Sequence, residues 1–246
     1  MKIIIPGEVV TALDILQNNG FEAYIVGGCV RDSIMGKKPS DWDIATSARP
    51  EEILECFNNY RTIETGLKHG TVTVIVKKMQ IEITTYRIDG EYSDRRRPDK
   101  VTFTNKIELD LQRRDFTINA LAYNQNGIID IFGGLHDIKN KIVKCVGHPD
   151  DRFNEDGLRI LRALRFASVL NFSIDDQTSD SIFKNKALLH DISTERINME
   201  FNKLIMGINY QNIIFNYRDI IEVFLPEIKG LSNEELRYRL NSMKEL

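Results

Sequence analysis

Apolar residues recur along the chain with two different periods. Residues 8–19 carry them every three or four positions and are followed by Gly20, which predicts a helix that ends at the glycine. Residues 71–76 (TVTVIV) and 81–86 (IEITTY) have the composition and alternation of strands and flank a short turn. The pattern therefore predicts a helix and, further along the chain, an antiparallel hairpin.

The remaining segments of the first half continue this mixture. A short helix is expected to begin at Pro50, because two glutamates follow the proline in the first turn. The polar stretch at residues 87–105 is expected to be a long loop with few anchoring side chains. Further strands are predicted at residues 23–26, 41–46 and 127–134, and a short helix at residues 115–123.

The character of the chain changes near residue 137, beyond which helical patterns dominate. The sequence therefore predicts an α+β fold with a domain boundary at this point. The expected head, residues 1–137, has a mixed, largely antiparallel sheet flanked by helices. An all-helical neck is expected over residues 138–215, and the start of a helical body over residues 216–246.

Composition limits the class of protein without indicating its function. The chain has 246 residues, of which 42% are hydrophobic, and this is enough to bury a core. It has no apolar run of about 18 residues for a membrane span, and its first residues are too weakly apolar for a signal peptide, so we expect a cytoplasmic protein. Its three cysteines and four histidines lack the spacing of a disulfide framework or a metal site. Nothing in the sequence indicates an oligomeric state.

Positive charge is gathered in three places, although the formal net charge is −3. A net negative charge is not typical of a domain that binds nucleic acid. Each cluster is either a solvated face or a surface for a polyanion. The clusters are residues 95–97, then Arg113 and Arg114, and then Arg159, Arg162 and Arg165.

Two carboxylates separated by one residue follow a glycine turn. Asp41 and Asp43 lie on a predicted strand, where residues two apart point to the same side. Carboxylates held together repel each other, and Mg²⁺ between them would remove this repulsion and complete its shell with water and substrate phosphates. In the preceding GGCVRD, Gly27 and Gly28 would let the backbone approach a triphosphate, and Arg31 would add positive charge. An Asp-x-Asp sequence alone is also common on protein surfaces.

In this order and spacing, the glycine turn and the two aspartates resemble motif A of the DNA polymerase beta superfamily of nucleotidyltransferases. Three later segments resemble successive motifs of the bacterial and eukaryotic tRNA nucleotidyltransferases, the CCA-adding enzymes, and of their poly(A) polymerase relatives. These segments are residues 113–123 (RRDFTINALAY), 130–134 (DIFGG) and 152–166 (RFNEDGLRILRALRF). The resemblance covers about residues 23–168.

The resemblance implies a role for each motif. Asp41 and Asp43 would hold Mg²⁺, which would activate the 3′-hydroxyl of a tRNA for attack on the α-phosphate of CTP or ATP. The residues implied to bind the incoming nucleotide are Gly27, Gly28, Arg31 and Arg114. Those implied to recognise it are Asp156, Arg159, Arg162 and Arg165. The expected partners are therefore the tRNA 3′ end, CTP and ATP.

The first pair of recognition residues also has a chemical rationale. Cytosine and adenine both present an amino donor beside a ring-nitrogen acceptor, which a carboxylate and a guanidinium can match together. Asp156 and Arg159, three apart on a predicted helix, would share a face, although this spacing also suits a surface ion pair. Arg162 and Arg165 drift by about 60° at each three-residue step, so periodicity does not place Arg165 beside Asp156.

Glu82, on the second strand of the predicted hairpin, is the candidate for a third carboxylate at the metal site. Its strand is expected to lie beside the strand that carries Asp41. The alternatives are a buried structural glutamate and a side chain that points outward.

Several activities remain compatible with the resemblance. Residues 65–74 (TGLKHGTVTV) and the presence of the loop at residues 89–101 favour addition of the full CCA sequence to tRNA. Addition of the terminal adenosine alone, poly(A) synthesis, transfer to a non-RNA acceptor and a binding fragment without turnover are the alternatives. Family members usually continue into domains that grip the tRNA, whereas this chain ends at Leu246. The resemblance therefore implies a truncated or short form, or a second chain that completes the RNA site.

Overall fold

The computed structural model describes residues 3–90 and 101–244 and divides the chain into two compact units. Of the described residues, 3–90 and 101–138 form the head unit, and 139–244 form the helical unit. Each unit has its own buried apolar core.

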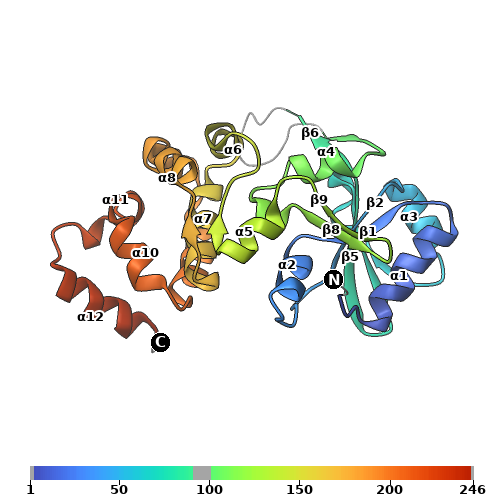
Figure 1. Ribbon diagram of the computed structural model, residues 1–246, viewed down its shortest axis with the longest axis horizontal. Helices are drawn as coiled ribbons and strands as arrows, with labels where there is room; N and C mark the ends of the chain where they lie inside the picture. Colours follow the sequence, from blue (N-terminus) through green and yellow to red (C-terminus); the bar gives the residue numbers. More distant parts are fainter. Residues whose placement is uncertain (1–2, 91–100, 245–246) are drawn as a thin grey trace. The chain divides into compact units, whose positions relative to one another are not determined.

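A mixed sheet forms the centre of the head unit (Figure 1). Its strands are β1 (Ala23–Val26), β2 (Asp43–Thr46), β3 (Arg61–Ile63), β4 (Thr71–Val76), β5 (Met79–Thr85), β8 (Leu121–Asn124) and β9 (Gly127–Asp130). Among the described residues the strand order is β3-β4-β5-β2-β1-β8-β9, and all neighbours are antiparallel except β2 and β5. The predicted α+β class with a mixed, largely antiparallel sheet is confirmed, as is the hairpin of β4 and β5.

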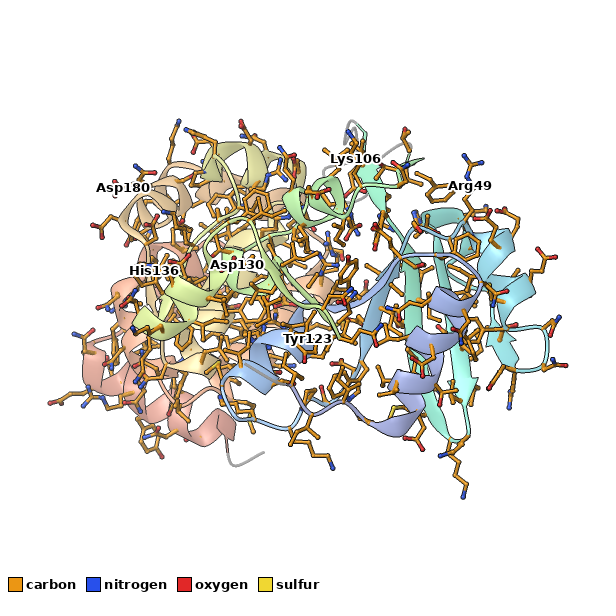
Figure 2. All side chains as sticks on the ribbon, turned by 45° about the vertical axis from the view of Figure 1, so that its right-hand side comes forward. Arg49, Lys106, Tyr123, Asp130, His136 and Asp180 are labelled. Atoms are coloured by element: carbon orange, nitrogen blue, oxygen red, sulfur yellow. The ribbon has the colours of Figure 1, made fainter. Side chains whose placement is uncertain are left out.

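Helices surround this sheet. They are α1 (Gly7–Asn18), α2 (Gly28–Ile34), α3 (Pro50–Cys56), α4 (Ile107–Gln112) and α5 (Gly134–Asn140), with 3-10 turns η1 (Leu67–His69) and η2 (Thr117–Asn119). The predicted helices at residues 8–19 and at Pro50 are present as α1 and α3. Figure 2 shows Tyr123 inside the head among packed side chains, whereas Arg49, before α3, points to solvent.

The two faces of the hairpin have different surroundings. Val72, Val74 and Val76 of β4 are buried, and both α1 and α3 contact this strand. On β5 the burial alternates, so that Gln80 and Glu82 are exposed while the isoleucines that follow each of them are buried. Because successive side chains of a strand point to opposite faces, Glu82 lies on the face of the sheet that α1 and α3 do not cover.

The long polar segment is better anchored than its composition indicates. Strand β6 (Arg87–Asp89) pairs antiparallel with β7 (Val101–Phe103), so the expected loop over residues 87–105 begins and ends as a hairpin. Asp89 forms ion pairs with Arg87 at 3.2 Å and with Arg113 at 3.6 Å. The pair with Arg113 joins segments far apart in the sequence, so local composition does not reveal it. The arginine cluster at residues 95–97 lies outside the described residues.

Residues 115–123 do not form the predicted helix. One 3-10 turn, η2, is followed directly by β8, which pairs with β1 on one side and with β9 on the other. Leu121 and Ala122 are fully buried in this central position. Sheet pairing on both sides outweighs the local helical propensity of the segment.

The helical unit is built on the packing of α7 (Leu158–Leu170) against α9 (Thr194–Ile205). Leu158, Leu161 and Leu164 of α7 are buried, as predicted. The other elements are α6 (Pro149–Glu155), α8 (Asp176–Lys184), α10 (Tyr210–Asn216), α11 (Arg218–Ile221), α12 (Asn233–Lys244), η3 (Lys186–Asp191), η4 (Pro226–Ile228) and the short parallel pair β10 (Ile142–Val143) and β11 (Ser173–Ile174). Within the part of the chain that the structure describes, every helix is too short or too polar to cross a membrane.

Candidate active site

Two of the predicted carboxylates lie side by side where β2 begins, and the third lies just before this strand. Asp43 is the first residue of β2, and Glu82 of β5 lies directly beside it in the parallel register. Asp41 precedes the strand, with its side chain exposed and its Oδ1 accepting a hydrogen bond from Ser40 at 3.1 Å. Trp42 between the two aspartates is buried. The strand is therefore shorter than predicted and carries Asp43 but not Asp41.

The electrostatics of this group favour a bound cation. Burial raises the pKa of Asp43 to about 6, and the negative charges of Glu82 and Asp41 act in the same direction, against the positive charge of Arg114. The described residues contain no group of three or more His, Cys, Asp or Glu side chains arranged to hold a metal ion. Mg²⁺ is often held by one or two carboxylates and takes its other ligands from water and substrate phosphates. Asp41 and Asp43 therefore fit a magnesium site that is completed by substrate.

The glycine turn brings the backbone close to an arginine. Gly27 has a φ of +75°, which a residue with a side chain rarely adopts, and it directly precedes α2. A Cβ atom at this position would lie 2.9 Å from Nη1 of Arg114. Gly28 opens α2, and the added Cβ there would lie 3.6 Å from Arg31. Gly27 thus leaves room for the guanidinium group of Arg114, whereas a side chain at Gly28 would make only ordinary contact with Arg31.

Arg31 and Arg114 are both held by side chains that sequence reasoning missed. Arg31 is buried and donates to Asn119 Oδ1 at 2.6 Å. Arg114 donates to the backbone oxygen of Asn119 at 3.5 Å and to Asp110 at 3.2 Å. Asp110 precedes Arg113 by three residues and Arg114 by four, the spacings at which helical side chains form ion pairs. This spacing could have been recognised in the sequence.

Asp110 is the anchor of this network. It is fully buried, and its Oδ1 also accepts two hydrogen bonds from Arg113, at 2.8 and 2.9 Å. Burial pushes the pKa of Asp110 upward, but the charges and hydrogen bonds of Arg113 and Arg114 together outweigh burial and hold this pKa below its ordinary value. The carboxylate therefore stays ionised and orients both arginines.

Asp156 and Arg159 do not lie on one helix, which corrects the prediction for this pair. Helix α6 ends at Glu155, and Asp156 has extended backbone angles before α7 begins at Leu158. The break coincides with Gly157, where an added Cβ would lie 3.0 Å from the backbone oxygen of Leu188.

The charged groups around this break have other partners than expected. Asp156 forms an ion pair with Arg196 of α9 at 2.7 Å. Arg159 pairs with Glu155, the last residue of α6, and donates to the backbone oxygen of Arg152 at 3.2 Å. The alternative interpretation, a surface ion pair between Asp156 and Arg159, is also wrong, because each of these residues pairs with a different side chain.

Arg162 and Arg165 converge on one buried carboxylate. Glu200 of α9 lies 3.8 Å from Arg162 and 3.1 Å from Arg165. The guanidinium of Arg165 also stacks over Phe166, 4.1 Å from the ring centroid. These two arginines are therefore partly structural, because they join α7 to α9.

Replacing Glu200 by alanine is expected to destabilise the protein. The substitution removes the shared carboxylate from beneath two guanidinium groups, and we expect a loss of about 3 kcal/mol in the free energy of unfolding. Urea denaturation measures this loss. Glu195→Ala, an exposed glutamate on the same helix, should change stability by no more than about 0.5 kcal/mol. Equal effects of the two variants would contradict a structural role for Glu200.

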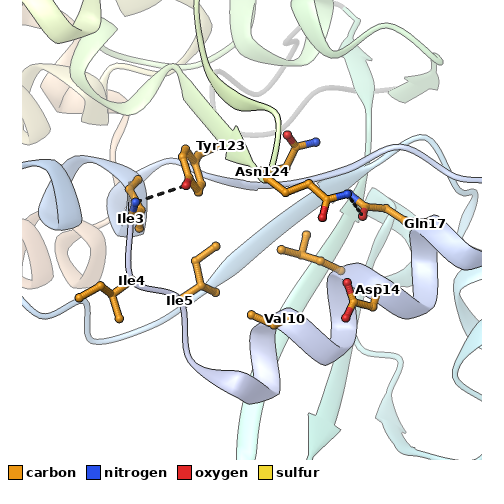
Figure 3. Close-up of a pocket in the computed structure, with 10 residues that line it drawn as sticks. Ile3, Ile4, Ile5, Val10, Asp14, Gln17, Tyr123 and Asn124 are labelled. Carbon is orange, nitrogen blue, oxygen red and sulfur yellow. Dashed lines mark hydrogen bonds between the residues drawn. The ribbon is translucent and has the colours of Figure 1, made fainter. Parts of the chain in front are cut away.

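Two cavities in the head unit differ in whether predicted site residues line them. One, of about 460 Å³, lies between the N-terminal residues 3–5 and α1 and contains none of the predicted site residues (Figure 3). The other, of about 750 Å³, is lined by Asp41 together with Lys37 and Lys38. Of the three carboxylates, Asp41 alone lines this cavity, beside two lysines.

Carboxylates beside a glycine turn, on a mixed sheet, are the arrangement of a nucleotidyltransferase head. Comparison with known proteins agrees with this class. Residues 23–144 match the family model "Poly A polymerase head domain", and residues 171–231 match "Probable RNA and SrmB-binding site of polymerase A". The chain belongs to the family of tRNA nucleotidyltransferases and poly(A) polymerases.

Individual relatives narrow the comparison. A "CCA-adding enzyme" of Lactobacillus delbrueckii subsp. bulgaricus is 52% identical over 201 residues, which is 81% of this chain and 50% of the relative. The crystal structure of the Bacillus stearothermophilus CCA-adding enzyme in complex with CTP has a TM-score of 0.77 and 42% identity, over 85% of this chain and 51% of that chain. A tRNA nucleotidyltransferase complexed with a primer tRNA and an incoming ATP analog has a TM-score of 0.72 and 30% identity, over 90% and 63%. The chain spans about half the length of the curated relatives it matches.

Proposed function

We propose that this protein adds CCA to the 3′ end of tRNA without a nucleic-acid template, using CTP and ATP and releasing pyrophosphate. The observation that carries the proposal is the juxtaposition of Asp43 and Glu82 beside Asp41, within the segment that matches the polymerase head. The 52% identity to a CCA-adding enzyme supports tRNA as the substrate. In each cycle the RNA 3′-oxygen bonds to the α-phosphorus of the nucleotide, and the bond from that phosphorus to pyrophosphate breaks.

Asp41 and Asp43 are proposed to hold Mg²⁺, with Glu82 as the candidate third carboxylate. Nucleotidyltransferases of this family typically use divalent metal ions. When bound, such an ion neutralises phosphate charge and lowers the pKa of a hydroxyl group bound to it. This chemistry would take place next to the glycine turn, because Asp43 pairs with the residue that precedes Gly27.

Arg31 and Arg114 are proposed to bind the triphosphate. Guanidinium groups form short, charge-assisted hydrogen bonds to phosphate oxygens, and both side chains are already oriented by Asn119 and Asp110. Gly28 beside them is partly exposed, whereas Gly27 is buried in the turn. The nucleotide would thus be bound with little loss of side-chain entropy.

Asp156 and Arg159 are proposed to select the base. Asp156 would accept a hydrogen bond from the amino group of cytosine or adenine, and Arg159 would donate to the adjacent ring nitrogen. Uracil and guanine present a donor where the arginine requires an acceptor. Arg162 and Arg165 are proposed to contribute positive charge to this site in addition to their contacts with Glu200.

Loss of the Asp156 carboxylate should relax base choice before it removes catalysis. For Asp156→Ala we expect kcat/KM for CTP and ATP to fall about tenfold to hundredfold, while incorporation of UTP and GTP rises relative to them. Competition assays with all four nucleotides measure this ratio. Asp180→Ala, an exposed aspartate labelled in Figure 2, is the matched control and should leave it unchanged. Unaltered discrimination in Asp156→Ala would contradict selection by the protein.

The proposed function is tested by incubating the chain and Mg²⁺ with tRNAs that lack CCA, CA or A, each with CTP, ATP or both. Ordered addition that stops after one adenosine would establish CCA addition. Adenosine added only to the CC-ended tRNA would indicate an A-adding enzyme, and continued adenosine addition would indicate poly(A) synthesis. Nucleotide binding without any extension would contradict turnover by this chain.

A further inference from the structure

We propose that Arg196 is a positioning residue that holds Asp156 in the orientation required for base selection. The inference rests on the proposed function of Asp156 and extends it to a helix outside the motif that carries this residue. Arg196 lies on α9, 40 positions along the chain from its partner.

The backbone by itself leaves Asp156 poorly constrained. The residue lies between α6 and α7 with extended angles, so no continuous helix orients its side chain. One carboxylate oxygen, Oδ1, accepts the backbone N–H of Leu158 at 3.0 Å. The other, Oδ2, accepts from Nη2 of Arg196 at 2.7 Å. Rotation of the carboxylate is therefore restricted only when both contacts are present.

The ion pair lies in a partly desolvated position, where it has more effect than on an open surface. The side chains of Arg196 and Asp156 are only 19% and 15% exposed. Each carboxylate oxygen can accept more than one hydrogen bond, so the contacts leave acceptor capacity for a base amino group. Arg196 thus orients Asp156 without occupying the whole of its acceptor capacity.

The face of α9 that carries Arg196 also forms ion pairs with α7. Glu200 follows Arg196 by four residues, the spacing at which helical side chains lie on one face. Glu200 binds Arg162 and Arg165 of α7. Helix α9 therefore presents a positive group to Asp156 and a negative group to the arginines of α7.

Without Arg196, the carboxylate would keep only its contact with the backbone and would sample other rotamers. If the Asp156 carboxylate is misoriented, it binds the amino group of cytosine or adenine more weakly. It also no longer disfavours uracil and guanine. We therefore expect the effect in KM and in base choice rather than in kcat.

The test compares Arg196→Ala, Arg196→Lys and the control Lys203→Ala, an exposed cation on the same helix. For Arg196→Ala we expect KM for CTP and ATP to rise roughly tenfold or more, with kcat little changed and increased incorporation of UTP and GTP. Arg196→Lys keeps the charge but not the planar donor fork, and should restore part of the KM and of the discrimination. Lys203→Ala should match the wild type, and thermal unfolding of each variant reports folding separately.

If the wild type discriminates among nucleotides and Arg196→Ala has the same KM and discrimination, this inference is overturned but the proposed function is not. The inference would also be overturned if Arg196→Ala and Arg196→Lys raised KM and weakened discrimination equally, and if both effects followed the decrease in melting temperature. That result would indicate a purely structural role for Arg196. A wild type that does not distinguish CTP and ATP from UTP and GTP would overturn base selection by Asp156 as well. These outcomes separate failure of the inference from failure of the proposed function.

Discussion

Replacing Asp43 by asparagine is expected to reduce nucleotide transfer by about a thousandfold, because a metal site that loses a carboxylate gives up several kcal/mol of transition-state stabilisation. The amide has nearly the same shape, so the fold should be retained. Removal of one negative charge from beside Glu82 and Asp41 also relieves repulsion, which should leave the melting temperature equal to or above that of the wild type. Single-turnover extension of a CC-ended tRNA with ATP measures the loss of transfer.

The matched control for this experiment is Asp14→Asn, an exposed aspartate on α1 that should not affect transfer. Asp41→Asn should resemble Asp43→Asn, because both carboxylates are proposed to bind the same ion. Full extension activity in either of these variants, at a melting temperature near that of the wild type, would show that the metal assignment is wrong.

Replacing Asp110 by alanine is expected to have the largest effect on stability. This carboxylate is fully buried and accepts hydrogen bonds from Arg113 and Arg114. Removing one member of a buried charged network costs about 3–5 kcal/mol, and urea denaturation at pH 7 should detect a loss of this size. Glu108→Ala, on the exposed side of the same helix, should change the free energy of unfolding by no more than about 0.5 kcal/mol.

The contribution of Asp110 should depend on pH in a defined direction. Its pKa in the folded protein is lowered, so the stabilisation is present above a pH of about 4, near the pKa of an unfolded aspartate, and is lost as pH falls through the folded value. The stability difference between wild type and Asp110→Ala should therefore shrink in acid. A difference that grows on acidification would contradict an ionised Asp110.

Asp110→Asn separates the positioning of Arg114 from stability. The amide keeps the volume of the side chain but not its charge, so more protein should remain folded than with alanine. If Arg114 binds the triphosphate, the folded fraction of this variant should show a raised KM for both nucleotides. A KM equal to that of the wild type would show that Asp110 acts on stability alone.

Local patterns were enough for much of the head unit. The apolar spacing of α1, the proline that opens α3 and the hairpin of β4 and β5 are each specified within a few residues. Gly27 and the aspartates after it could be selected as a site because backbone freedom and paired carboxylates are chemical properties of the residues themselves. The neighbouring position of Glu82 needed only the pairing of β5 with β2.

The sequence by itself therefore determined the class of fold and the chemical groups of the candidate site. The spacing of Asp110 and Arg114 was already present in the sequence. Only the tertiary structure decided that Arg196 contacts Asp156, because these residues lie 40 positions apart. The break before α7 likewise coincides with a contact distant in sequence, the close approach of Leu188 to Gly157. The physical reason is that periodicity and propensity act over one or two helical turns, whereas a buried charge takes its partner from whichever element the fold packs against it.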